Sequence, residues 1–414
     1  MSTRPGAVAV RGRLVVPDAV IDDGLIVIEA DRILWVGGAD QAASAGFVDV
    51  TRTAVRAAEG SFLLPGLVDL HNHGGGGASF PDAQDLADVR RAAVEHLKHG
   101  TTSLVASLVT ADPATLVAQA SLLAEAVDTG DLVGIHLEGP FLSNVRRGAH
   151  DPTMLQAGDS GLVQTLASAA RGHIVTMTVA PEVVGVRGPT GAIEALAATG
   201  AVPSFGHTDA DVAEVEGAVA EARQALTAAG TRSARPTATH LFNGMRPLHH
   251  RAPGPVAACL ESAARGELVV ELIADGVHLD DALVRMVFGL LDPGAIVLVT
   301  DAMAGAGMPD GSYQLGTMNV RVLDGVARTE DGAIAGGTAH LLDVVRSAVR
   351  AGVPLENAVR SASLTPAGVL GRKDIGALQI GRRADLLVTD AHLEPLAVMR
   401  SGRWLVGATT HPPR

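Results

Sequence analysis

The sequence is poor in cysteine, in aromatic residues and in long apolar runs. Cys259 is the single cysteine among 414 residues, so no intrachain disulfide can form. Aromatic residues make up only 2% of the chain. The core must therefore be built from aliphatic side chains, as in the interior of a parallel barrel. No apolar run approaches the ~20 residues that a membrane span requires, which argues against a membrane partner.

Positive charge is also scarce. The formal net charge is −13, and Lys98 and Lys373 are the only lysines. Such an acidic chain argues against a nucleic-acid partner, and an anionic substrate would need a local cationic pocket. The first ten residues lack the charged-then-apolar pattern of a signal peptide. The absence of this pattern, together with the single cysteine, predicts a cytoplasmic protein.

The two ends of the chain have a similar composition and are expected to fold together. Short segments of alternating polarity occur at residues 7–16, 24–36, 375–390 and 395–407. Alternation bounded by turn residues is typical of antiparallel strands. We therefore expect a small β-sandwich domain formed by residues 1–61 together with residues 372–414.

Between these ends, apolar strands alternate with helical segments. The expected strands lie at residues 63–71, 101–110, 132–141, 173–182, 202–210, 237–245, 268–278 and 295–303. Eight such repeats predict an α/β protein with a TIM-like (β/α)8 barrel over residues 62–371. The alternative is an open doubly wound sheet, which needs a glycine-rich phosphate-binding turn after its first strand. The glycines at 74–77 do not match that fingerprint and follow two histidines instead.

The pair His71 and His73 ends the first barrel strand. Residues i and i+2 of a strand point to the same side, so both imidazoles could bind one metal ion. An isolated His-x-His is more often a turn with no ligand role. Here the following strands also end in polar residues, which are Glu138, His207, His240, His278 and Asp301. The carboxyl ends of barrel strands converge on one mouth, and buried ionisable groups are too costly to gather there without a function.

This set of residues predicts a binuclear metal site. Glu138, His207 and His240 would supply three ligands and leave one position open, as in catalytic zinc sites. His71 and His73 could hold a second ion, with Glu138 bridging and Asp301 as a further ligand. A carboxylated lysine cannot bridge, because neither lysine lies at a strand end. We expect two divalent ions, with zinc favoured and iron, manganese or cobalt as alternatives.

The expected chemistry is metal-assisted hydrolysis of a C–N bond. A divalent ion lowers the pKa of a bound water from ~15.7 to about 7 and so generates hydroxide at neutral pH. Asp301 could accept the proton of that water and deliver it to a leaving nitrogen. His278 could polarise a carbonyl oxygen.

Six motifs carry a family resemblance. They are PGLVDLHNHG (65–74), HLEGPF (136–141), GHTDA (206–210), ATHLFNGM (238–245), ADGVH (274–278) and LVTDAM (298–303). In this order they resemble the amidohydrolase superfamily and, more closely, the family of N-acetylglucosamine-6-phosphate deacetylases. Gly148-Ala149-His150 after the second motif and residues 251–254 after the fourth separate this family from hydantoinase-like and dihydroorotase-like relatives.

The resemblance implies roles for individual residues. Glu138, His207 and His240 would hold the principal metal, Asp301 would be the general base and acid, and His278 would contact the acetyl carbonyl. The implied sugar-phosphate pocket consists of Ala149, His150, Asn243, Gly244, Asp275, Gly276, Val277, His278, Ile334, Ala335 and Gly336. Arg251 would reach the phosphate across a homodimer interface. The implied reaction converts N-acetylglucosamine 6-phosphate to glucosamine 6-phosphate and acetate.

Two other functions compete with this one. The first is a different amidohydrolase activity, such as that of a deaminase or a cyclic-amide hydrolase. The second is a non-catalytic binding protein on the same barrel, which would be expected to have lost metal ligands. Some members of the resembled family lack the opening His-x-His and work with one metal. This chain retains it, which favours two ions.

Overall fold

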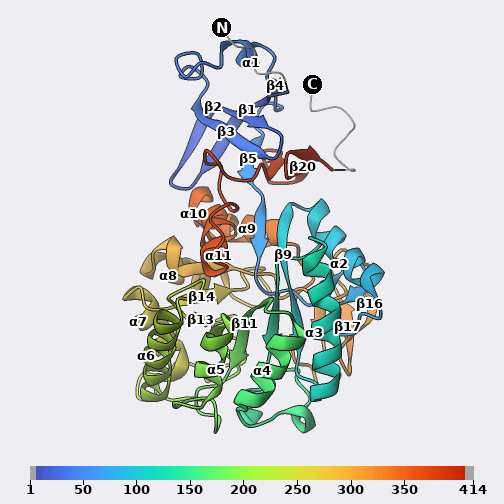
Figure 1. The fold of residues 1–414 in the computed structure, drawn as a ribbon, viewed down its shortest axis with the longest axis vertical. Helices are drawn as coiled ribbons and strands as arrows, with labels where there is room; N and C mark the ends of the chain where they lie inside the picture. Colours follow the sequence, from blue (N-terminus) through green and yellow to red (C-terminus); the bar gives the residue numbers. More distant parts are fainter. Residues whose placement is uncertain (1–5, 406–414) are drawn as a thin grey trace.

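The computed structural model describes residues 6–405, which form a parallel barrel and a smaller sheet built from both ends of the chain (Figure 1). The barrel strands lie in chain order and are β6 (Leu67–Asp69), β9 (Thr101–Val109), β10 (Gly134–Glu138), β11 (Ile174–Val179), β12 (Val202–Phe205), β13 (Thr237–Ala238), β14 (Val269–Leu272) and β15 (Ile296–Leu298). The predicted (β/α)8 barrel is confirmed.

The barrel closes just beyond the ends of its first and last strands. The amide of Asp301 donates to the carbonyl of His71 at 2.9 Å, and the amide of His73 donates to the carbonyl of Ala302 at 2.7 Å. Asn72 and Ala302 form a parallel bridge between these segments. The closure therefore places the segment carrying His71 and His73 directly beside Asp301.

Helices cover the outside of the barrel. They are α2 (Leu86–Lys98), α3 (Pro113–Asp128), α4 (Ser160–Ala169), α5 (Ala192–Thr199), α6 (Val212–Ala229), α7 (Gly254–Ala264), α8 (Asp281–Leu290) and α9 (Leu341–Arg350). Several begin with an aspartate whose carboxylate accepts amide hydrogen bonds of the first turn, a preferred N-cap. These N-caps are Asp85, Asp112, Asp159, Asp211 and Asp280. Each cap fixes where the chain turns from the loop into the helix.

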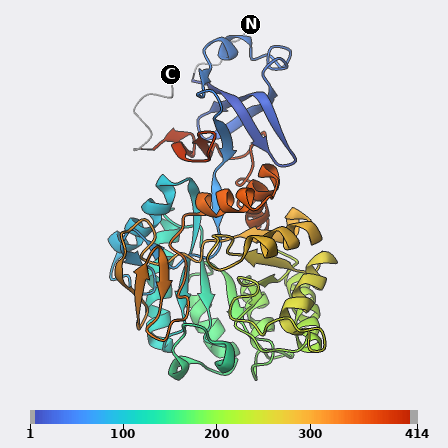
Figure 2. The same ribbon diagram turned by 180° about the vertical axis from the view of Figure 1, so that it is seen from behind.

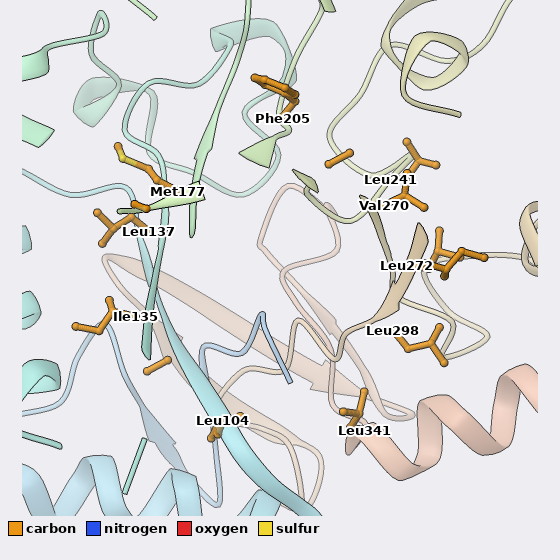
Figure 3. Packing of buried hydrophobic residues seen from close by; sticks show 14 of the residues in the cluster. Leu104, Ile135, Leu137, Met177, Phe205, Leu241, Val270, Leu272, Leu298 and Leu341 are labelled. Carbon is orange, nitrogen blue, oxygen red and sulfur yellow. The ribbon is translucent and has the colours of Figure 1, made fainter. Parts of the chain in front are cut away.

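The main hydrophobic core lies between the strands and the helices. Figure 3 shows part of it, including Leu137 of β10, Phe205 of β12 and Leu272 of β14, all buried. Since adjacent strand residues point to opposite faces, the outward Leu137 leaves Glu138 on the inner face. A second cluster joins β6, β9, β14 and β15 to α11 (Leu364–Val369), at the end of the barrel nearer the small sheet. The C-terminal mouth lies at the opposite end.

The sheet of the chain ends contains β1 (Val8–Val16), β2 (Ala19–Glu29), β3 (Arg32–Gly38), β4 (Val55–Arg56), β5 (Phe62–Pro65), β19 (Leu386–Thr389), β20 (Pro395–Arg400) and β21 (Arg403–Trp404). The two ends meet where β5 pairs with β1 on one side and with β19 on the other. A short helix, α1 (Val48–Arg52), precedes β4.

The strand pairing places β5 in this sheet, whereas the sequence analysis assigned residues 62–65 to the barrel. The apolar run from Phe62 to Leu70 conceals the crossing between the two, which occurs at Gly66. A Cβ at Gly66 would lie 2.2 Å from Thr102 and 2.8 Å from Asp385, so only glycine fits. The outermost parts of the predicted small domain, residues 1–5 and 406–414, lie outside the described residues.

The sequence analysis missed a small sheet after the last barrel strand. It consists of β16 (Gly311–Leu315), β17 (Met318–Leu323) and β18 (Val326–Arg328), and it lies against the side of the barrel (Figure 2). The remaining elements are β7 (Gly74–Gly75), β8 (Ala78–Ser79), α10 (Leu355–Ser361) and the 3-10 turns Asn144–Arg146, Pro152–Met154 and Pro293–Ala295. Among residues 6–405, no helix has the length and apolar character needed to cross a membrane.

Candidate active site

The predicted ligand residues meet around the carboxylate of Glu138 at the end of β10. Its Oε1 atom lies 3.0 Å from Nε2 of His207 and 2.8 Å from Nε2 of His240. His207 follows β12 and His240 follows β13. The structure therefore brings together three donors, the first and last of which are 102 positions apart in the chain.

The other oxygen of Glu138 faces a second group of donors. Oε2 lies 3.2 Å from Nε2 of His73 and 3.6 Å from Nε2 of His71. Oδ1 of Asp301 lies 3.3 Å from Nε2 of His71 and 3.2 Å from Nε2 of His73. The two groups thus share one carboxylate, as a residue that bridges two ions would require.

These donors fit divalent metal ions. Ligand atoms about 2.0–2.2 Å from a tetrahedral ion are about 3.4 Å apart, close to the separations observed here. All four imidazoles present Nε2 to the centre, and three donate Nδ1–H elsewhere, which fixes the tautomer with a free lone pair on Nε2. The Nδ1 partners are the Glu271 carboxylate for His71, the Ser107 carbonyl for His73 and the Arg146 carbonyl for His207. Imidazole and carboxylate donors together suit zinc, iron, manganese or cobalt.

Three of the candidate ligands have an unusual backbone. His207, His240 and Asp301 have φ values of 46°, 27° and 49°, in the left-handed region that residues other than glycine rarely adopt. Each of these residues lies two or three positions beyond the end of a short strand. Such conformations cost of order 1–3 kcal/mol and persist where the surroundings impose them, often at functional sites. The strain turns these side chains into the mouth of the barrel.

The two groups of donors are strongly coupled electrostatically. Burial disfavours the charged form of His71, but the carboxylates of Glu138 and Asp301 raise the pKa of its imidazole well above the usual range. The pKa of His73 is also raised against the effect of burial, by hydrogen bonds with Asp301 and Glu138. Although burial opposes it, the charge of His71 holds the pKa of both carboxylates below their usual range.

These pKa shifts predict a pH dependence of metal binding. Because the pKa values of His71 and His73 are raised in the metal-free protein, a metal ion must compete with protons for these imidazoles. Affinity should therefore rise with pH, by up to about tenfold per pH unit for each proton released. Chelator competition between pH 6 and 8, with calorimetry in two buffers to count protons, measures this. An affinity independent of pH in that interval would contradict it.

The buried carboxylate of Asp69 supports the segment that carries His71 and His73. Asp69 accepts hydrogen bonds from Thr300 Oγ1 at 2.6 Å and from Asn72 Nδ2 at 3.2 Å. Burial raises the pKa of Asp69 to about 6, against these hydrogen bonds, which favour the charged form. Asp69 thereby joins the ends of β6 and β15, on which His71 and Asp301 depend.

We expect Asp69→Ala to lower the free energy of unfolding by about 3 kcal/mol, since it removes the buried carboxylate that accepts the shortest hydrogen bond of Thr300 and one of the hydrogen bonds of Asn72. Urea unfolding of the chelator-treated protein measures this change without a contribution from bound metal. Glu330→Ala, at an exposed position, should change stability by less than about 0.5 kcal/mol. A loss below about 1 kcal/mol in Asp69→Ala would show that the network adds little.

A cavity of about 270 Å³ opens above the donors, near the lower end of the range for small-molecule sites. Its lining includes these predicted residues: His73, Glu138, Ala149, His150, His207, His240, Asn243, Gly244, His278, Asp301, Ile334, Ala335 and Gly336. His71 is fully buried behind the others. Donors and predicted pocket residues thus lie around one space.

His278 lines the cavity and is held by Asp275. Nδ1 of His278 donates to Oδ2 of Asp275 at 2.8 Å, and the same carboxylate accepts the amides of Val277 and His278. Burial opposes the charge on His278, but this hydrogen bond raises the pKa of the imidazole. Asp275, Gly276 and Val277 do not line the cavity themselves. They shape the turn that presents His278.

Arg251 does not line the cavity of its own chain. Its side chain is exposed, and its Nη1 atom lies 2.9 Å from Nε2 of His250. The cavity lining also contains residues that were not predicted to form the pocket, which are Val109, Gly148, Leu315, Met318 and Ala333. Leu315 and Met318 come from the missed sheet, and no motif marks them. Gly148 precedes Ala149 and His150, so its neighbours in the sequence already pointed to it.

A third group of possible donors lies away from the cavity. Glu95 of α2, His99 after it and His340 at the start of α9 lie within 4.8 Å of one another. The rings of His99 and His340 are stacked, with centroids 3.5 Å apart and planes at 12°. Their lone pairs lie in nearly parallel planes and do not converge on one ion. We assign no metal to this group.

Comparison with known proteins agrees with this geometry. Residues 62–405 match the model of the amidohydrolase family, and this segment contains the whole barrel and every candidate ligand. The chain belongs to the amidohydrolase family.

Its relatives define a narrower group. The chain is 33% identical over 357 residues to an N-acetylglucosamine-6-phosphate deacetylase of Vibrio furnissii, covering 84% of each chain. It is 34% identical over 356 residues to the enzyme of that name from Homo sapiens, covering 83% of each. The structure of the Mycobacterium smegmatis deacetylase superposes with a TM-score of 0.83 at 38% identity, covering 96% of this chain and 100% of that one. Within the amidohydrolases, the chain belongs to the N-acetylglucosamine-6-phosphate deacetylase family.

Proposed function

We propose that the protein hydrolyses the acetamide of N-acetylglucosamine 6-phosphate to glucosamine 6-phosphate and acetate. The observation that carries the proposal is the placement of Glu138, whose two oxygens face two groups of donors at the barrel mouth. Relatives at 33–34% identity carry the name of this activity. A structurally similar variant of the Mycobacterium smegmatis enzyme contains N-acetyl-D-glucosamine-6-phosphate.

The site residues would have separate roles in amide hydrolysis. Divalent ions bound by the donors would supply a Lewis acid that polarises the amide carbonyl and lowers the pKa of a bound water. Asp301, at the boundary of the cavity, would accept a proton from the attacking water and transfer it to the departing nitrogen. His278, oriented by Asp275, would donate a hydrogen bond to the carbonyl oxygen.

The donor set supports two ions per chain, with zinc favoured. Glu138, His207 and His240 would hold one, and His71, His73 and Asp301 the other, with Glu138 shared. Imidazole and carboxylate donors are the usual ligands of catalytic zinc, but they also suit iron, manganese and cobalt, so availability would decide among these metals. The low cysteine content further supports a cytoplasmic enzyme.

The position of Arg251 supports a homodimer in which each chain completes the pocket of the other. The guanidinium is exposed and lies outside the cavity of its own chain, so it is free to meet a phosphate in the cavity of a second copy. A charge-assisted, bidentate contact between arginine and phosphate is strong and geometrically specific.

We expect Arg251→Ala to raise KM for the phosphorylated substrate by about 10–100-fold, with little change for unphosphorylated N-acetylglucosamine. Arg223→Ala, on the exposed face of α6, is the matched control. Mixing Arg251→Ala with Asp301→Asn chains tests the contribution across the interface. A dimer of the two would contain one pocket with both residues intact, so activity should return. If mixing restores nothing, the arginine acts within its own chain.

The substrate is tested by acetate release from phosphorylated and unphosphorylated N-acetylglucosamine. We expect kcat/KM to be about 10–100-fold higher for the phosphorylated sugar, because a charge-assisted hydrogen bond to the phosphate contributes a factor of this size. Equal values would favour another amidohydrolase activity, such as that of a deaminase or a cyclic-amide hydrolase. Metal binding without turnover of any of these substrates would favour a binding protein.

A further inference from the structure

The buried carboxylate of Glu271 lies beneath the metal-ligand histidines, outside the cavity. It is the third residue of β14 and only 2% exposed. Neither the sequence motifs nor the cavity lining includes it. Its Oε2 atom lies 3.3 Å from Nδ1 of His71 and also accepts the backbone N–H of His240 at 3.3 Å. One oxygen atom therefore contacts a residue from each of the two donor groups.

The contact with His71 fixes its imidazole. A carboxylate that accepts the Nδ1–H of a histidine selects the tautomer with a free lone pair on Nε2 and orients the ring. His71 is fully buried, and its Nε2 atom points toward Asp301 and Glu138. Without Glu271, Nδ1 of His71 would lose the acceptor that holds this arrangement.

The contact with His240 acts through the backbone. His240 differs from the other three imidazoles, because its Nδ1 atom has no hydrogen-bond partner among the described residues. The orientation of its ring therefore depends on its backbone, which has a φ of 27°. Glu271 holds that backbone at two points. Its side chain accepts the amide of His240, and its backbone carbonyl accepts the amide of Leu241 at 2.8 Å.

We propose that Glu271 is a positioning residue shared by the two metal subsites, orienting His71 through its ring and His240 through its backbone. The inference rests on the proposed two-ion site and extends it to a residue that touches neither substrate nor metal. It predicts that the two ions lose affinity together when this carboxylate is removed, although their other ligands differ.

The test is a cobalt(II) titration of the chelator-treated protein, followed by calorimetry and visible absorption. In Glu271→Ala we expect both dissociation constants to rise by about 10–100-fold, the usual effect of removing a residue that supports a metal ligand. Glu271→Gln, whose oxygen can still accept both hydrogen bonds, should recover affinity to within about tenfold of the wild type. If the alanine variant does not fold, Glu271→Met, which keeps the length of the side chain but has no oxygen acceptor, takes its place with the same expected loss.

Asp385→Asn is the matched control, because Asp385 is a buried carboxylate that contacts Arg383 and Thr102, away from the donors. We expect a lower melting temperature in this variant but no change in cobalt affinity. Unchanged affinity in the variant that lacks the acceptor, Glu271→Ala or Glu271→Met in its place, would overturn the shared role, and so would a loss confined to one ion. A wild type that binds no cobalt would overturn the two-ion site as well. A wild type that binds two ions without releasing acetate would overturn only the proposed substrate.

Discussion

Asp301→Asn is expected to reduce kcat for acetate release by about 10³-fold while the protein keeps its metal. Asparagine has nearly the shape of aspartate and retains an oxygen that can face His71 and His73, which lie 3.3 and 3.2 Å from Oδ1. It cannot accept and return a proton, and proton transfer by a positioned side chain contributes typically 10²–10⁴-fold. Steady-state kinetics of acetate release, with metal analysis of the same preparation, measures both effects.

The control for this variant is Asp310→Asn, an exposed aspartate on the segment that follows β15. It should leave kcat unchanged. Full activity in Asp301→Asn would remove Asp301 from the mechanism. Loss of activity together with loss of metal would make Asp301 primarily a ligand, and the proton transfer would need another group.

Glu138→Gln is expected to lower the metal content of the protein more than Asp301→Asn does. Its two oxygens face separate donor groups, and an amide nitrogen in place of either oxygen cannot bind a cation. At least one group therefore loses a ligand, and both lose negative charge. Removing a residue that supports a metal ligand typically lowers metal affinity by about 10–100-fold. We expect a larger loss of affinity in Glu138→Gln, and we expect acetate release to fall to background.

Glu95→Gln is the matched control for this substitution. Glu95 is also a mostly buried glutamate beside histidines, but the stacked rings of His99 and His340 cannot converge on one ion. Metal content and activity should therefore be unchanged in this variant. Two tightly bound ions in Glu138→Gln would contradict the bridging role and would require the two groups to hold metal independently.

The barrel and the donors were predictable because almost every barrel strand is an apolar run that ends in a polar residue. That pattern located Glu138, His207, His240 and Asp301 without any knowledge of their contacts. The sharing of Glu138 between two groups also followed from the convergence of strand ends. The metal roles of these residues stay predictions until an ion is measured.

The rest of the site depends on tertiary contacts that leave no local pattern. Glu271 has the same appearance in the sequence as any polar residue within a strand, and its function depends on where β14 lies beside His71. Leu315 and Met318 reach the cavity because the sheet from β16 to β18 folds back against the barrel. Phe62 to Pro65 continue the apolar run of β6, so only strand pairing reveals that they belong to the other sheet.

The central claim is that two ions held around Glu138 are required for hydrolysis. Its most direct test is to count metal ions per chain, remove them with a chelator, and follow acetate release from N-acetylglucosamine 6-phosphate as each metal is returned. The account predicts two ions per chain, no turnover in the metal-free protein, and recovery on metal addition. Undiminished acetate release from protein shown to contain no metal would contradict it.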